Sequence, residues 1–218
     1  MNAKKLGATF AALACLASST SAFAYGEGDF FARLGMVRIE PTGGSAHLGG
    51  ALQGATVDVE TERGAAFTLG YRFTDKFGVE LLAAPQSFKH DINVRAGGDT
   101  ITRGSVRHLP PTLTLQYYPL GGTDAQVQPY IGAGVNYTRF SSEHLSLEDT
   151  SLKLEDGWNA AAQVGVDYQL TSNLALNLAV WYLDIDSTAI VHQGGQEVSR
   201  ADIDINPIVV MSGISLRF

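Results

Sequence analysis

The stretch that decides the fold runs from Ala160 to Tyr182 and reads AAAQVGVDYQLTSNLALNLAVWY. On both sides of a central Thr-Ser-Asn, every second position carries an apolar side chain, whereas small and polar residues occupy most positions between them. Such alternation places the apolar side chains on one face of a β-strand and the others on the opposite face. The stretch therefore predicts two strands joined by a short turn.

Alternation with a period of two recurs along the rest of the chain, and no long segment follows the 3.6-residue period of a helix. Eight segments carry the alternation, at residues 30–37, 67–73, 77–83, 111–117, 131–137, 160–170, 174–182 and 208–218. Most have about the length that a tilted strand needs to cross a bilayer, on the order of 10 residues. The pattern therefore predicts an all-β protein.

The connections between the eight segments are of two kinds. Short, turn-like links lie at residues 74–75, 119–128 and 171–173, and long polar links lie at 42–62, 86–107, 141–157 and 187–200. Short and long links alternate, as do the periplasmic turns and extracellular loops of a transmembrane barrel. Strands in lipid must also close into a barrel, because lipid offers no hydrogen bonds to free backbone groups. We therefore expect an eight-stranded antiparallel transmembrane β-barrel with both termini on the periplasmic side.

The C-terminal segment helps to decide against the alternative, a secreted lipocalin-like or sandwich protein whose apolar face would point inward. The chain ends on Phe218, and Leu216, Ile214 and Val210 share its parity. This ending is typical of the strand that the outer-membrane barrel assembly machinery recognises, which favours the transmembrane interpretation. The expected partners are therefore outer-membrane lipids and, through Phe218, the assembly machinery.

Residues 1–24 have the features of a cleaved secretory signal peptide. Two lysines precede an apolar stretch, Leu6–Leu16, and Ala22–Ala24 offers small residues at the positions that a signal peptidase reads. Cleavage there would leave residues 25–218 as a single barrel domain. The single cysteine, Cys15, lies inside this segment, so a lipoprotein signal is the alternative. In the signal-peptide interpretation the mature chain has no cysteine for a disulfide or a metal site.

Composition and histidine spacing argue against nucleic-acid binding and catalysis. The 218 residues include 15 Lys and Arg against 22 Asp and Glu, a net charge of −7, whereas nucleic-acid phosphates require basic patches. The histidines are scattered over connections and strand edges without the spacing of metal ligands, at His47, His90, His108, His144 and His192. Neighbouring Ser and Asp residues at these places are common in turns. We therefore expect no enzyme activity, no cofactor, and no catalytic or metal-binding residues.

Charged residues on the polar face of the strands should pair inside the barrel, since an unpaired charge in a narrow interior is costly. These residues are Arg33, Arg72, Glu80, Asp167 and Arg217. They are too few for the continuous charged lining that an ion pore needs. In the third long link, residues 148–156 alternate Leu with charge, and either a short amphipathic helix or a strand extension fits them.

Six stretches, in order, make the mature chain resemble the OmpW family of small bacterial outer-membrane barrels over nearly its whole length. They lie at residues 28–33 (GDFFAR), 78–84 (GVELLAA), 108–113 (HLPPTL), 129–138 (PYIGAGVNYT), 163–168 (QVGVDY) and 180–186 (VWYLDID), ahead of the final Arg217-Phe218. Each stretch is weak evidence alone, and their common order makes the signal specific.

The resemblance implies an eight-stranded barrel with a narrow, largely hydrophobic lumen that admits small apolar molecules and releases them sideways into the membrane. It also implies a Leu and a Trp that close the channel floor, which by motif are Leu82 and Trp181. Strand parity turns both side chains inward as well. The alternative is that they fill the barrel as ordinary core, since eight strands enclose little more than side chains.

Two functions from different classes fit these observations. In the first, the barrel gives small hydrophobic molecules a narrow apolar passage across the outer membrane, past Leu82 and Trp181. In the second, it is a structural or surface-interaction barrel whose long extracellular loops bind phage, bacteriocin or host factors.

Overall fold

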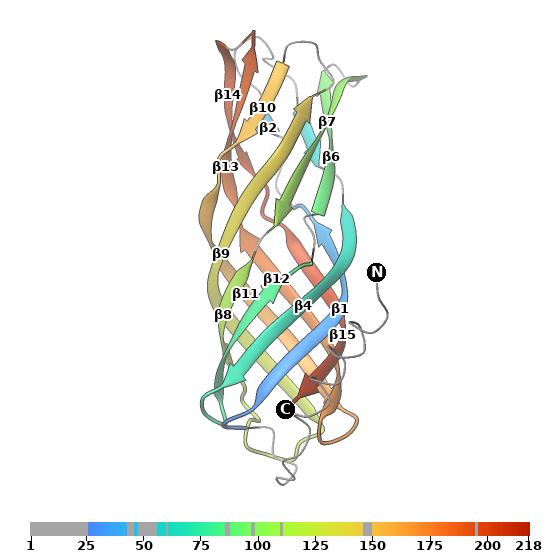
Figure 1. The fold of residues 1–218 in the computed structure, drawn as a ribbon, viewed down its shortest axis with the longest axis vertical. Coiled ribbons are helices and arrows are strands. Elements are labelled where there is room, and N and C mark those ends of the chain that lie inside the picture. The colour runs from blue at the N-terminus through green and yellow to red at the C-terminus, as the bar shows by residue number, and fades with distance from the viewer. Residues whose placement is uncertain are drawn as a thin grey trace, which may run out of the picture.

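A computed structural model describes residues 26–42, 46–47, 56–59, 61–85, 88–96, 99–109, 111–145, 150–194 and 196–218. The expected signal peptide lies outside these residues, so its cleavage stays a prediction. Strands dominate the described chain (Figure 1). Across the same ranges, no helix is long and apolar enough to span a membrane.

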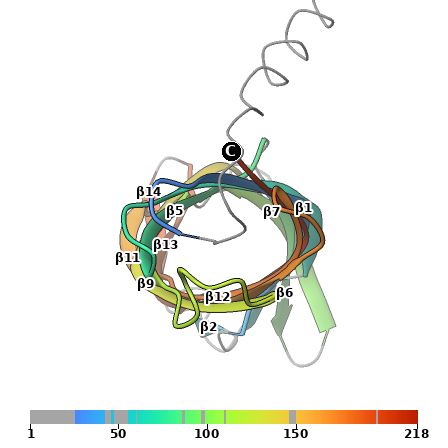
Figure 2. The same cartoon turned by 90° about the horizontal axis from the view of Figure 1, so that it is seen from below.

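Eight strands form the wall of the molecule, and every neighbouring pair is antiparallel. They are β1 (Phe30–Glu40), β4 (Glu62–Arg72), β5 (Phe77–Ala83), β8 (Thr112–Tyr117), β9 (Val127–Leu145), β11 (Gly157–Gln169), β12 (Leu174–Asp184) and β15 (Ile208–Arg217). Their order is β11-β12-β15-β1-β4-β5-β8-β9, and β9 pairs back to β11. The wall is therefore a closed ring, as Figure 2 shows, and the predicted eight-stranded antiparallel barrel is confirmed.

The remaining strands extend one end of the barrel, the upper end of Figure 1. They are β2 (Ala46–His47), β3 (Thr56–Val59), β6 (Phe88–Ala96), β7 (Asp99–Leu109), β10 (Thr150–Leu154), β13 (Asp186–Gln193) and β14 (Gln196–Asp204). Much of what the sequence analysis described as long connections is therefore strand. Continuing the ladder pairs backbone groups that a loop would have to satisfy by other means.

The charged, Leu-containing run near residue 150 is a strand extension where the structure describes it. Residues 150–154 form β10, which pairs with β13 from Thr150 opposite Gln193 to Leu154 opposite Ala189. Of the two alternatives left open by the sequence, the helix is excluded for these residues, because a neighbouring strand was available to complete their backbone hydrogen bonds.

Two threonines fix short turns at the opposite, lower end. The hydroxyl oxygen of Thr74 accepts hydrogen bonds from the backbone N–H groups of Lys76 and Phe77, at 3.2 and 2.9 Å. That of Thr171 accepts from Asn173 and Leu174 in the same way, at 3.3 and 3.1 Å. These local bonds are the ordinary turn chemistry of hydroxyl side chains, and they confirm two of the three predicted short links.

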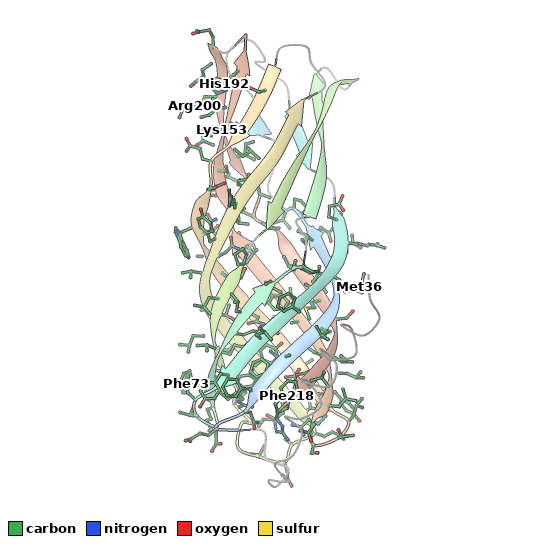
Figure 3. All side chains as sticks on the ribbon, in the orientation of Figure 1. Met36, Phe73, Lys153, His192, Arg200 and Phe218 are labelled. Atoms are coloured by element: carbon green, nitrogen blue, oxygen red, sulfur yellow. The ribbon has the colours of Figure 1, made fainter. Side chains whose placement is uncertain are left out.

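The two faces of the wall differ as the alternation predicts. Outward positions carry exposed apolar side chains, such as Met36 at 61% and Ile131 at 58% exposure. Figure 3 labels Met36 on the outer surface, and it places Phe73 and Phe218 at the lower end. Inward positions on the same strands are buried, including Arg33 and Trp181. The predicted inward and outward faces are correct on all eight wall strands.

Aromatic side chains mark both ends of the outward apolar surface. Ring pairs with centroids 4.5 to 5.2 Å apart lie near the short turns (Phe30 with Tyr71, Phe77 with Tyr117) and near the extended strands (Tyr137 with Trp158). Aromatic girdles of this kind sit at the two membrane–water interfaces of outer-membrane barrels. The apolar surface between them is the part that lipid covers.

Candidate functional site: the lumen

The interior of the barrel consists of two regions with opposite chemistry. The lower region, which we name the ionic plug, is built around Arg33, Glu80 and Asp167 with polar and aromatic neighbours. The upper region, the apolar chamber, is a packed cluster that includes Val37, Ile39, Ala66, Leu82, Trp181, Leu183 and Val209. Both regions belong to the same wall strands, since a strand that supplies a polar residue below supplies an apolar one above.

Arg33 holds the plug together by pairing with two carboxylates at once. Its guanidinium forms ion pairs with Glu80 and with Asp167, the latter at 2.6 Å, and all three side chains are fully buried. These residues come from β1, β5 and β11. The expected pairing of inward charges is therefore confirmed for this group.

Each carboxylate oxygen of the plug has a hydrogen-bond partner. Glu80 accepts from the hydroxyl of Thr68 at 2.9 Å and from the amide of Gln163 at 2.7 Å. Asp167 accepts from the amide of Asn177 at 2.7 Å in addition to the guanidinium of Arg33. A buried ion pair is tolerated only when its remaining lone pairs are satisfied in this way. The plug therefore meets the condition for a stable buried charge cluster.

Two aromatic rings support the Arg33 guanidinium, and each ring covers a glycine of the neighbouring strand. The guanidinium carbon lies 4.3 Å from the ring centre of Phe31 and 4.5 Å from that of Tyr130, which is cation–π geometry. Phe31 is opposite Gly70 in the β1–β4 pair, and Tyr130 is opposite Gly165 in the β9–β11 pair. A Cβ at either glycine would overlap the ring. These glycines make the room that the stacked rings need.

The other two inward arginines lie at the lower end and find different partners. The Arg72 guanidinium stacks on the ring of Tyr118 at 3.8 Å and donates to the backbone carbonyl of Asp75. Arg217 pairs with Asp29 at 3.3 Å. The prediction of paired inward charges is thus confirmed for Arg217 as well. Arg72 instead contacts the Tyr118 ring and the carbonyl of Asp75.

Leu82 and Trp181, the two residues proposed as a constriction, both point into the apolar chamber. Leu82 is 6% exposed and Trp181 is fully buried, and they belong to one packed cluster. A cavity of about 20 Å³ adjoins Leu82, room for about one water molecule. Its walls are Val37, Ile39, Ala66, Leu82, Ala83, Ala84, Leu183 and Val209. Among the described residues the lumen is apolar in this region and polar in the plug, whereas the resemblance implied a largely hydrophobic lumen.

The wall beside the cavity is less continuous than elsewhere. Pairing between β4 and β5 ends at Phe67 opposite Ala83, and pairing between β5 and β8 ends at Leu82 opposite Thr112. β4 itself continues up to Glu62, and within the described residues its ladder partner there is β1 alone. The cavity thus lies where the pairing of β5 with β4 and β8 ends. Nothing in the alternation pattern indicated this break.

Sequence reasoning missed the polar neighbours that complete the plug. Gln163 links three strands, because its side-chain oxygen accepts from Thr114 and Gln116, each at 2.9 Å, while its amide donates to Glu80. Parity does place these residues inward. Which of them meet depends on strand register around the closed barrel, and the sequence carries no local signal for that.

Metal and catalytic chemistry has little support in the described part of the chain. No group of three or more His, Asp and Glu side chains there is arranged to hold a metal ion. Of the histidines, the structure describes the side chain of His192, which lies at the upper end (Figure 3). The side chains of His47, His90, His108 and His144 lie outside the described residues.

Comparison with known proteins settles the family. The model of the OmpW family matches residues 26–218. The chain belongs to the OmpW family. Outer membrane protein W of Escherichia coli strain K12 is 42% identical, over 99% of this chain and 100% of the relative. The predicted resemblance is confirmed, and the protein is an outer-membrane barrel.

Two further comparisons extend this result. The crystal structure of the outer membrane protein OprG from Pseudomonas aeruginosa superimposes with a TM-score of 0.82 at 36% identity, covering 91% of this chain and 99% of OprG. The dibenzothiophene metabolism operon protein PahQ of Pseudomonas aeruginosa is 29% identical over 94% of this chain and 95% of the relative. The names of OprG and of the Escherichia coli relative describe outer membrane proteins.

Proposed function

We propose that this barrel gives small hydrophobic molecules a narrow apolar passage across the outer membrane. The extended strands face the cell exterior, both termini and the short turns face the periplasm, and residues 1–24 are removed on export. Solutes enter from the upper end, reach the apolar chamber and pass Leu82 and Trp181.

The single observation that carries the proposal is an apolar chamber that lies directly above an ionic plug. Apolar surface that leaves water is stabilised by roughly 25 cal/mol per Å², so the chamber favours a hydrophobic solute. The plug disfavours it, because an apolar molecule would displace hydrogen bonds of buried charges. A solute in the chamber therefore leaves sideways, beside Ala83 and Ala84, where the backbone pairing of β5 ends next to the cavity.

One relative supports this solute class. PahQ takes its name from an operon for the metabolism of dibenzothiophene, a small, apolar, fused-ring compound. A cell that metabolises such a compound must first move it across an outer membrane, and a barrel with an apolar chamber fits that requirement.

A second function rests on a separate observation, the length of the upper hairpins. Strands β6 and β7 pair over nine positions and β13 and β14 over eight, so the barrel extends far beyond its apolar belt. Such a surface suits a structural or surface-interaction barrel that meets phage, bacteriocin or host factors.

Truncating the constriction distinguishes the two functions. The double variant Leu82→Ala/Trp181→Ala should take up a small apolar compound several-fold faster than wild type, because it removes the packing across the chamber. Leu82→Asp should slow uptake, because the solute would have to pass a hydrated charge. Leu81→Ala is the matched control, since its side chain faces outward on the same strand at 40% exposure.

Uptake should be measured with a radiolabelled apolar compound in cells that carry equal amounts of each variant, against cells without the barrel. Resistance to SDS before boiling shows that each variant is folded. A closed barrel resists the detergent because all backbone groups of its strands are hydrogen-bonded within the barrel. Unchanged uptake by a folded double variant would leave Leu82 and Trp181 as core and favour the surface-interaction function.

A further inference from the structure

The indole N–H of Trp181 is a buried donor without an acceptor. The side chain is fully buried, and its Nε1 has no hydrogen-bond partner among the described residues. Buried tryptophan N–H groups normally find an acceptor, because they have given up their hydrogen bond to water. An unpartnered one in the lumen of a channel needs an explanation.

The neighbours of Trp181 cannot supply that acceptor. Gln163 stands directly opposite on β11, but its side-chain oxygen already accepts two hydrogen bonds from Thr114 and Gln116. An amide oxygen has two lone pairs, so both are used. Val209 stands opposite on the other side, and the next inward positions of β12 are Ala179 and Leu183. Apart from Gln163, the inward residues that flank Trp181 on its own strand and on the neighbouring strand are thus apolar.

The same neighbours connect Trp181 to the cavity of the apolar chamber. Leu183 and Val209, which flank Trp181 along its strand and across the sheet, both line that cavity. Trp181 therefore stands at the boundary between the plug, which begins at Gln163, and the space that a solute would occupy. Trp181 itself does not line this cavity, so a solute larger than the cavity must move Leu183 or Val209 aside before it reaches the ring.

We propose that the chamber selects apolar solutes that carry a single hydrogen-bond acceptor, such as a ketone, ester or ether oxygen, over pure hydrocarbons. The indole N–H of Trp181 donates to that oxygen while the aliphatic side chains contact the rest of the molecule. This selectivity rests on the proposed passage function. Trp181 is then a specificity-determining residue, because its indole N–H can donate a hydrogen bond and the indole cannot accept one.

A spectroscopic test uses the two tryptophans of the chain. Trp158 is 72% exposed on the outward face, so its indole N–H is an internal control for Trp181. In the barrel purified in detergent and labelled with 15N, 2-heptanone should move the Trp181 indole proton downfield, and n-heptane should leave it in place. A Trp181 resonance that responds equally to both compounds, or only as Trp158 does, overturns the proposal.

An uptake test uses Trp181→Phe, which removes the donor and keeps an aromatic ring. The readout is the ratio of 2-heptanone to n-heptane uptake at equal barrel abundance, and this ratio should fall roughly fivefold, as expected for the loss of one hydrogen bond. Leu183→Ala, which alters the cavity without touching a donor, should change both rates in proportion. If Trp181→Phe also changes both rates in proportion, the ring acts by size alone and the proposal is wrong.

Failure of the selectivity can be told apart from failure of the passage function. Suppose that wild-type cells take up both compounds faster than cells without the barrel, and that Trp181→Phe does not change the ketone preference. The selectivity alone is then refuted. If neither compound enters faster than in cells without the barrel, the passage function itself fails. The spectroscopic test applies to wild type and stays decisive if Trp181→Phe does not fold.

Discussion

The ionic plug and the apolar chamber are built from the same strands, yet the plug consists of paired charges and the chamber of packed apolar side chains. A step of two residues along β5 leads from Glu80 in the plug to Leu82 in the chamber, on the same inward face. On β1 a step of four residues leads from Arg33 in the plug to Val37 in the chamber. The wall holds both regions through backbone hydrogen bonds, which do not depend on side chains. Side chains of the lumen can therefore specialise without breaking the backbone pairing of the wall.

The comparison also indicates which region tolerates change. Plug residues share partners, so the loss of one leaves others buried and charged. Chamber residues contact one another through dispersion, so the loss of one leaves a cavity whose cost depends on how far its neighbours relax. We therefore expect substitutions in the plug to lower the free energy of unfolding and substitutions in the chamber to change the uptake rate.

The largest effect should follow from Arg33→Met. It leaves Glu80 and Asp167 buried without a cation, which should cost about 3–5 kcal/mol of the free energy of unfolding. Urea unfolding in detergent, followed by tryptophan fluorescence, measures this. Arg38→Met is the matched control, because Arg38 is half exposed and pairs with Glu40 at 3.2 Å, so its loss should cost at most about 1 kcal/mol.

A triple variant sharpens the Arg33 result. Arg33→Met combined with Glu80→Gln and Asp167→Asn removes all three charges, so it should be more stable than Arg33→Met alone. Equal loss in both variants would mean that shape, and not uncompensated charge, limits the plug.

A smaller effect is expected where an aromatic ring covers a glycine of the plug. Gly165→Ala places a Cβ against the ring of Tyr130 and should cost about 1–3 kcal/mol, the usual range for overpacking. At Gly157, on the same strand but away from the plug, a Cβ meets only ordinary contacts. Equal unfolding free energies for Gly165→Ala and Gly157→Ala would argue against the stacked arrangement around Arg33.

Deletion of Phe218 should act on the shared wall and hardly at all on the lumen. In the assembled barrel the Phe218 backbone N–H donates to the carbonyl of Phe30 at 2.9 Å, a bond worth about 0.5–1.5 kcal/mol. We predict a large drop in the amount of barrel in the outer membrane and a small change in the stability of what is assembled. Phe73→Ala, an exposed aromatic at the same end, is the control. Normal abundance of the truncated protein would remove the assembly-signal argument.

The smallest effect concerns pH at the upper hairpin, outside both lumen regions. Asp186 is exposed and stands directly opposite Asp204 in the β13–β14 pair, and slight desolvation together with the nearby Asp204 and Asp184 carboxylates raises its pKa. A carboxyl group with a raised pKa in the folded state destabilises that state when charged. The hairpin should therefore become slightly more stable as pH falls from 7 toward the ordinary Asp value of about 4.

Amide hydrogen exchange of β13 and β14 at pH 7 and in mild acid, corrected for intrinsic exchange, measures this stability. Asp186→Asn should protect the hairpin at pH 7 and abolish its pH response. A hairpin that loses protection in acid would contradict the assignment to Asp186.

Much of the architecture was predictable because it depends on neighbouring residues. Alternation within each segment is a local property, and it correctly turned Leu82 and Trp181 inward and Met36 and Ile131 outward. The alternation of long and short links indicated a transmembrane barrel, and the need of strands in lipid to pair all their backbone groups predicted its closure. The same reasoning left residues 148–156 undecided, because a nine-residue run that alternates Leu with charge suits a helix as well as a strand until a partner such as β13 is present.

The contents of the lumen were decided only when the barrel closed. Arg33 and Asp167 are 134 positions apart, and they meet because eight strands in a particular register close around one narrow interior, with β12 and β15 between β11 and β1. The same closure occupies the Gln163 oxygen with two donors and leaves the Trp181 N–H without an acceptor within the described part of the chain. The position of a residue in the alternating pattern predicts only that its side chain points inward. Which side chains it meets there depends on the registers of all eight strands, which no local segment encodes.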